Sequence, residues 1–160
     1  MEVDKIYVIS LDYSRESLGN IANRLSKLNI PGVPYLITRA FDGRVQVAPP
    51  QYSIYNGWKI DGHENNWWNR EVLPGEVGCT ISHINVWKDI VENGHQRVLV
   101  LEEDFKPIKS LSDLSDKELA KEDWDLCYLG RNRVNNIYDE VSISDILVKP
   151  EASYNSHAYL

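Results

Sequence analysis

Two short, mainly apolar runs place the strongest constraint on how this chain can fold. Residues 5–11 (KIYVISL) and residues 97–101 (RVLVL) carry apolar side chains at both odd and even positions, so neither run can expose a whole face to water. Strands that are buried on both faces are typical of the parallel sheets of α/β proteins. A helical pattern over residues 14–29 and a short strand over 35–37 then predict a strand–helix–strand unit.

The rest of the chain predicts one long helix and several shorter elements. Pro74 suits the first turn of a helix, and Gly94 suits its end. Strands are predicted over 124–130, 143–148 and 154–160, with an acidic helix or loop over 111–121. Residues 45–73 show little periodicity, so we expect an irregular segment with one short helix near 65–70. The predicted fold class is α/β, with a mostly parallel (mixed) sheet flanked by helices.

Tryptophan and cysteine positions give weaker expectations. Trp58, Trp67 and Trp68 are candidates for a sugar-binding platform, whereas Trp87 is expected to pack in the core. Cys79 and Cys127 lie in apolar segments without CxxC spacing, which predicts two buried, reduced thiols.

The charge of the chain limits its partners. With a formal net charge of -7 over 160 residues, general attraction to nucleic acid or to an anionic membrane is not expected. A phosphorylated substrate would also be repelled unless a cation or local basic side chains intervene. The N-terminus lacks the pattern of a secretory signal, and no run approaches the ~20 apolar residues that cross a bilayer. We therefore expect a cytoplasmic protein without a membrane span.

The strongest chemical signal is the acidic triplet that directly follows the second apolar run. Glu102, Glu103 and Asp104 would repel one another at the end of a buried strand, and a divalent cation relieves that repulsion. Carboxylate oxygens are the ligands that Mg²⁺ and Mn²⁺ prefer. On an extended backbone Glu102 and Asp104 face the same way, so they are the predicted metal ligands, and Glu103 faces the nucleotide or a neighbour. Solvated acids that cap a strand are the alternative interpretation.

Polar residues near the ends of other predicted elements extend this candidate site. Ser10 and Asp12 end the first strand, and Arg15 opens the following helix, where an anion or nucleotide is favoured. On the long helix, a small residue allows close approach, and hydroxyl or imidazole groups can meet ribose or phosphate. Taken singly, each of these residues also fits a structural role, and Asp42-Gly43 is first of all a turn signal. The helix residues concerned are Gly78, Ser82 and His83.

Five segments, taken in order, resemble glycosyltransferase family 25. The most specific is LPGEVGCTISH at residues 73–83, followed by Val86 and Trp87. The others are IYVISL at 6–11 with a following Arg, the Asp-Gly pair at 42–43, the acidic triplet, and WDLCYLGR at 124–131. The last segment is similar to the collagen-type branch of the family in particular.

The resemblance implies a GT-A-type nucleotide-diphospho-sugar transferase fold, a UDP-sugar donor, and Mn²⁺ (or Mg²⁺) that joins the diphosphate to the acidic motif. It implies a hexosyltransferase that transfers galactose or glucose to a hydroxyl of a glycan, a glycolipid or a collagen-like hydroxylysine. Family members continue past the position that matches Leu160, so we expect residues 1–160 to form a single, C-terminally truncated donor-binding domain. The acceptor base is then expected beyond Leu160, and the catalytic residues stay unknown. The expected donor-binding residues are Ser10, Leu11, Asp12, Arg15, Asp42, Gly78, Ser82, His83 and Glu103, with Glu102 and Asp104 on the metal.

Two other functions remain open from the sequence. A non-catalytic module that binds UDP or a sugar nucleotide fits a chain that lacks the acceptor side. A nucleotidyltransferase also uses a parallel sheet and a carboxylate-bound metal, but it usually needs a Gly- and Lys-rich phosphate loop after the first strand. Residues 11–15 contain neither Gly nor Lys.

Overall fold

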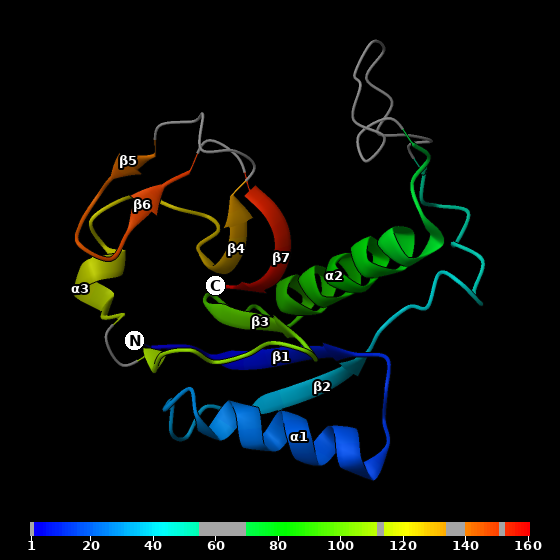
Figure 1. Ribbon diagram of the computed structural model, residues 1–160, viewed down its shortest axis with the longest axis horizontal. Helices are drawn as coiled ribbons and strands as arrows, with labels where there is room; N and C mark the ends of the chain where they lie inside the picture. The colour runs from blue at the N-terminus through cyan, green and yellow to red at the C-terminus, as the bar shows by residue number, and fades with distance from the viewer. Residues whose placement is uncertain (1, 55–69, 112–113, 134–139, 151–152) are drawn as a thin grey trace. The chain divides into compact units, whose positions relative to one another are not determined.

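The protein is described by a computed structural model that covers residues 2–54, 70–111, 114–133, 140–150 and 153–160 (Figure 1). The chain divides into two compact units. One comprises Met1–Thr38 with Gly94–Leu160, and the other comprises Arg39–Asn93. Two predictions fall on residues that the structure does not describe. These are the sugar platform of Trp58, Trp67 and Trp68, and the short helix near 65–70 except for Arg70.

Five strands form one mixed sheet in the order β2-β1-β3-β7-β4 (Figure 1). β1 and β3 are parallel, with Lys5 beside Val98 and Ile9 beside Glu102, so the two runs that constrain the fold are adjacent strands. β7 is antiparallel to both β3 and β4. The predicted mixed sheet is confirmed, but a mostly parallel one is not: of the described pairs, β1–β3 is parallel, and β3–β7 and β4–β7 are antiparallel. The strand bounds are Lys5–Ser10 for β1, Tyr35–Arg39 for β2, Val98–Glu102 for β3, Tyr128–Arg133 for β4 and Ser153–Tyr159 for β7.

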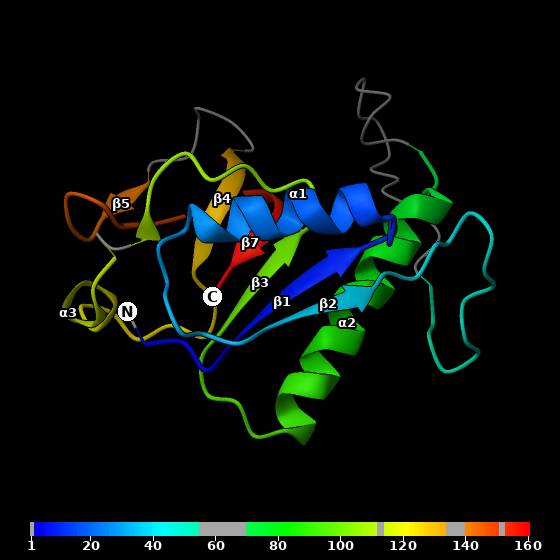
Figure 2. The same cartoon turned by 90° about the horizontal axis from the view of Figure 1, so that it is seen from below.

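The first helix, α1 (Arg15–Ser26), is placed by its cap and its apolar side. Ser14 is the N-cap, and its Oγ accepts a hydrogen bond from the Ser17 N–H at 3.1 Å. Ile21 is buried and belongs to the same core cluster as side chains of β1 and β3, and α1 lies over one face of the sheet (Figure 2). The main members of this core are Ile6, Val8, Ile21, Leu28, Leu99, Leu101, Phe105, Leu119, Ala158 and Leu160.

The long helix α2 (Pro74–Glu92) belongs to the second unit and begins and ends where the sequence predicts. Pro74 occupies the first turn, and the Glu76 carboxylate accepts a hydrogen bond from the Leu73 N–H at 2.7 Å. Gly94 follows the helix with φ of 68°, a backbone conformation that side chains rarely adopt.

Two strand predictions near the C-terminus need correction. The strand expected over 124–130 begins only at Tyr128, and residues 124–127 precede it without regular structure. The strand expected over 143–148 is wrong, because residues 143–147 connect β5 (Val141–Ser142) to β6 (Val148–Lys149), and only Val148 of that range belongs to a strand. The acidic connection over 111–121 contains the single-turn helix α3 (Asp116–Leu119). Within the described part of the chain, no helix combines the length and the apolar character that a membrane span needs.

Two predictions about burial are also wrong. Trp87 is 47% exposed rather than packed in the core, and Cys79 is exposed, whereas Cys127 is half-buried. Successive residues of a helix point about 100° apart, so the neighbours of buried residues in an apolar segment need not be buried. The buried residues of α2 are Gly78, Ile81, Ser82, His83 and Val86.

Candidate functional site

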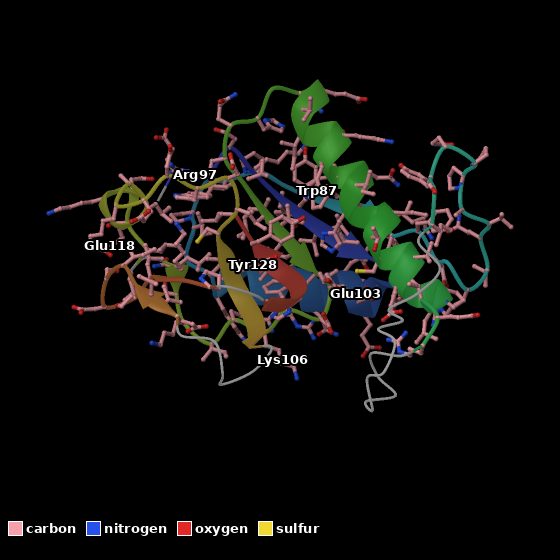
Figure 3. All side chains as sticks on the ribbon, turned by 90° about the horizontal axis from the view of Figure 1, so that it is seen from above. Trp87, Arg97, Glu103, Lys106, Glu118 and Tyr128 are labelled. Atoms are coloured by element: carbon pink, nitrogen blue, oxygen red, sulfur yellow. The ribbon has the colours of Figure 1, made fainter. Side chains whose placement is uncertain are left out.

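Glu103, labelled in Figure 3, follows the last residue of β3 and hydrogen-bonds to the carboxyl end of β1. The backbone N–H of Glu103 donates to the Ile9 carbonyl at 2.9 Å, which continues the parallel ladder by one residue. The Ser10 hydroxyl, which is 1% exposed, donates to the Glu103 carboxylate, and the Asp12 N–H lies 3.3 Å from the same oxygen. Glu103 therefore faces the end of β1, which is the neighbour that the sequence left unnamed.

The backbone turns at the acidic triplet instead of continuing as a strand. Glu102 is the last residue of β3, and the Phe105 N–H donates to the Glu102 carbonyl at 3.0 Å, which closes a turn over Glu103 and Asp104. The extended backbone from which we predicted that Glu102 and Asp104 face the same way is therefore absent. The Arg24 guanidinium of α1 donates to the Glu103 carbonyl, which fixes the turn from its other side.

The oxygen atoms at this turn suit a hard divalent cation. Glu102 is half-buried and Asp104 is exposed, and both side chains end in carboxylate oxygens, which Mn²⁺ and Mg²⁺ prefer. The Glu103 carboxylate already accepts hydrogen bonds from Ser10 and Asp12. The assignment of Glu102 and Asp104 as metal ligands rests on their carboxylate chemistry and stays a prediction.

Asp12 shapes the connection from β1 into α1. Its carboxylate accepts from the Ser14 N–H at 2.8 Å and lies 3.0 Å from the Ser14 hydroxyl, so the side chain stabilises the turn that precedes the helix. Arg15 is the first residue of α1 and is exposed, and Leu11 is 44% exposed. The structure thus brings Ser10, Asp12 and Glu103 into direct contact at one edge of the sheet.

A second cluster of predicted residues lies within the other unit, where the chain at Phe41–Gly43 packs on the first turns of α2. The Phe41 N–H donates to the Ser82 hydroxyl at 2.8 Å, and that hydroxyl donates to the Gly78 carbonyl at 2.7 Å. A Cβ atom on Gly78 would lie 2.4 Å from the Phe41 oxygen, and one on Gly43 would lie 1.9 Å from the Pro74 oxygen. Both glycines are therefore required for this backbone approach.

The predicted polar residues of this cluster are engaged by the protein itself. The Ser82 hydroxyl is occupied on both sides, and His83 is 4% exposed with its ring 6.4 Å from that of Trp87. Asp42 pairs with Arg44, whose guanidinium lies 2.8 Å from each carboxylate oxygen, and this pairing lowers the pKa of Asp42 below its usual value. A ligand-binding role for Asp42, Gly78, Ser82 and His83 stays a prediction.

Three contacts of these clusters were not predicted from the sequence. They are the Arg24 contact with the Glu103 carbonyl, the close approach of Gly43 to α2, and the pair of Arg70 with Glu76 at 2.6 Å. The Asp-Gly turn signal at residues 42–43 gave a hint of the Gly43 contact. The other two contacts had no sequence signal, because they depend on how the chain folds around them.

A surface hollow of about 570 Å³ lies beside the first residues of β1 and β2. It is away from the turn over residues 102–105, which we call the acidic turn. Val3, Pro34 and Leu111 line the hollow together with the loop over residues 29–33. Because none of the predicted site residues lines this hollow, it lends no support to the donor site.

Comparison with known proteins gives matches along almost the whole chain. The profile of glycosyltransferase family 25 (LPS biosynthesis protein) matches residues 3–157. Procollagen galactosyltransferase 2 of Mus musculus is 26% identical over 160 residues, which cover 97% of the chain and 25% of that protein. Procollagen galactosyltransferase 1-B of Xenopus laevis is 30% identical over 169 residues, which cover 100% of the chain and 27% of that protein.

Another relative is named as probably inactive. The probable inactive glycosyltransferase 25 family member 3 of Rattus norvegicus is 31% identical over 169 residues, which cover 99% of the chain and 28% of that protein. The chain thus spans about a quarter of the length of these relatives. The profile match over almost the full sequence, together with these relatives, shows that the chain belongs to glycosyltransferase family 25.

Proposed function

We propose that this chain is the donor-binding part of a glycosyltransferase that uses a UDP-hexose, either UDP-galactose or UDP-glucose, with Mn²⁺ or Mg²⁺. The observation that carries the proposal is the turn at the end of β3, where Glu103 is held by Ser10 and Asp12 while Glu102 and Asp104 flank it. Ligands of open α/β sheets collect beyond the carboxyl ends of the strands, which is where this turn lies. A GT-A-type fold is part of the same proposal.

The side chains at this edge divide into two roles. Glu102 and Asp104 would hold the metal ion, which when bound neutralises charge on the leaving diphosphate. Glu103 fixes the ends of β1 and β3 relative to each other, so it acts on the nucleotide site by positioning its neighbours. Arg15, at the exposed start of α1, offers a cation where the helix N-terminus also favours an anion.

Asp104→Asn is the direct test of the metal assignment. The substitution removes the charge of an exposed side chain that has no partner among the described residues, so the fold should be unaffected. We expect UDP binding in the presence of Mn²⁺, measured by calorimetry, to weaken at least tenfold. Asp123→Asn, at another exposed acid of the first unit, is the matched control and should bind UDP as the parent does. Equal binding by Asp104→Asn and the parent would exclude Asp104 as a metal ligand.

A second candidate function is a module that binds the sugar nucleotide without transferring the sugar. The name of the probable inactive glycosyltransferase 25 family member 3 of Rattus norvegicus favours it. This function predicts UDP binding without release of UDP from any donor sugar. Donor hydrolysis that requires Mn²⁺ and disappears with EDTA would favour the transferase instead.

The acceptor and the cellular location are further parts of the proposal. A glycan, a glycolipid or a collagen-like hydroxylysine would each present the hydroxyl that a hexosyltransferase needs. The relatives from Mus musculus and Xenopus laevis that are named procollagen galactosyltransferases favour the collagen-like acceptor. We expect a cytoplasmic location, and fractionation of cells that produce the protein would test it.

A further inference from the structure

The ring of His157, on β7, packs against Gly130 of the edge strand β4. A Cβ atom placed on Gly130 would lie 2.4 Å from Nε2 of His157, 3.0 Å from its Cδ2 and 3.4 Å from its Cε1. These three atoms are the nearest neighbours of that position, and all belong to one imidazole ring. Gly130 therefore provides the space in which the ring of His157 lies against the backbone of β4.

The register of β7 places His157 at the same end of the sheet as the acidic turn. Val100 of β3 is paired with Tyr159, and Leu101 is paired with Ala158. Extending this register by one residue on each strand would set Glu102 opposite His157. Directly opposed residues of an antiparallel pair share one face, and successive residues alternate between faces. Leu101 and Ala158 belong to the hydrophobic core, so Glu102 and His157 share the other face of the sheet.

The contact with Gly130 places the ring of His157 on the β4 side of β7, opposite to the β3 side. β7 lies between β3 and β4, and neighbouring strands are about 4.8 Å apart. The ring leans over β4, away from β3, so it is poorly placed to share a metal ion with Glu102. Imidazole is also a less suitable ligand than carboxylate for Mn²⁺ or Mg²⁺. A diphosphate that extends from a metal ion at Glu102 across β7 toward β4 would meet the ring N–H groups.

The chemistry of His157 suits such a diphosphate. The side chain is half-buried, and within the described residues it takes part in no hydrogen bond or ion pair. The chain carries a net charge of -7, so an anion at this edge needs local N–H donors as well as a cation. Arg24, a basic residue near the acidic turn, already donates to the Glu103 carbonyl.

We propose that His157 is a donor-binding residue that gives a hydrogen bond to the diphosphate of the sugar nucleotide, and that Gly130 is a positioning residue that seats its ring. This inference rests on the proposed function, because it needs a diphosphate at the acidic turn.

The test compares three variants of the full chain by UDP titration in the presence of Mn²⁺. His157→Phe keeps a planar ring over Gly130 but removes both ring nitrogens, and we expect UDP to bind about tenfold more weakly. Gly130→Ala displaces the ring, and the same loss is expected although His157 is unchanged. The double variant should show no loss beyond that of His157→Phe, because both changes remove one interaction.

Three readouts separate this contact from other causes. Binding of Mn²⁺ without nucleotide, measured by electron paramagnetic resonance, and binding of uridine, measured by ligand-observed NMR, should be unchanged in all variants. Weaker Mn²⁺ binding by His157→Phe, or additive losses in the double variant, would overturn the inference. Parent-like UDP binding by His157→Phe would overturn it and leave the proposed function intact. If the parent does not bind UDP, both the inference about His157 and the proposed function are wrong.

Discussion

The two clusters of predicted site residues are held by different means. At the end of β3 the contacts are made by side chains, since the Ser10 hydroxyl and the Arg24 guanidinium hold Glu103 by its carboxylate and its carbonyl. At the start of α2 the contacts are made by backbone, since Gly43 and Gly78 allow two chain segments to approach without any Cβ between them. The first arrangement positions charged groups, whereas the second positions the helix itself.

This difference indicates where ligand chemistry is to be expected. Two of the predicted polar side chains near α2 are hydrogen-bonded within their own unit, because Ser82 bonds to Phe41 and Gly78, and Asp42 bonds to Arg44. At the sheet end, Asp104 is exposed and has no partner among the described residues. Substitutions near α2 should therefore affect stability, and substitutions at the sheet end should affect stability and ligand binding in separable ways.

The largest effect is expected for Gly78→Ala. The new Cβ would lie 2.4 Å from the Phe41 carbonyl oxygen, which belongs to the backbone and can move only with its segment. We expect a loss of about 3 kcal/mol in the free energy of unfolding, measured by urea titration. Gly75→Ala is the matched control on the same helix, because nothing lies within 4 Å of its Cβ position. The control should not destabilise the protein, since alanine favours helix.

A Gly78→Ala variant as stable as Gly75→Ala would show that the close approach at Phe41 contributes nothing. The contrast between backbone and side-chain contacts would then no longer hold.

A smaller effect is expected for Ser10→Ala. The change leaves the half-buried Glu103 carboxylate without its main hydrogen-bond donor, and we expect a loss of about 2 kcal/mol. A double-mutant cycle with Glu103→Gln separates this contact from the burial of Ser10 itself. A coupling energy near zero would mean that Glu103 does not hold the end of β1. Ser17→Ala, at a hydroxyl of α1 for which no side-chain contact is described, is the control.

Much of the first unit was predictable because local signals and long-range packing agree there. Ser14 caps α1 as its residue type predicts, and the apolar runs at β1 and β3 are adjacent because both must be buried on two faces. The antiparallel insertion of β7 between β3 and β4 was not predictable, since a short strand pattern contains no information about its partner.

The candidate site was predictable as a set of residues but less so as a geometry. The triplet at 102–104 and Ser10 meet at one edge, as strand ends in a parallel pair must. The turn at Glu103 was missed because it depends on Arg24 and on Ser10, which are distant in sequence. His157 was missed altogether, because its position depends on the register of β7 and on the bare backbone of Gly130.

The smallest effect is expected for Glu76→Gln, because its charged side chain only adds to the close backbone contacts at the start of α2. The Glu76 carboxylate accepts from Arg70 at 2.6 and 2.9 Å and from the Leu73 N–H at 2.7 Å. The Arg70 guanidinium, and then the Leu73 N–H, lower the pKa of Glu76 below its ordinary value. The side chain is about one third exposed, so we expect a loss of only about 1 kcal/mol at neutral pH.

The lowered pKa also fixes the sign of the pH dependence of this loss. A carboxyl group whose pKa is lower in the folded state stabilises the protein above its unfolded pKa and loses that contribution as the pH falls through its folded pKa. The stability difference between the parent and Glu76→Gln, measured by thermal unfolding, should therefore be largest near pH 7 and shrink as the pH falls below 4.5, the ordinary value for Glu. Glu71→Gln, an exposed acid beside the same helix start, should show no such difference. A difference that stays constant down to pH 3 would mean that the charge of Glu76 does not stabilise α2, and that backbone contacts alone hold this region.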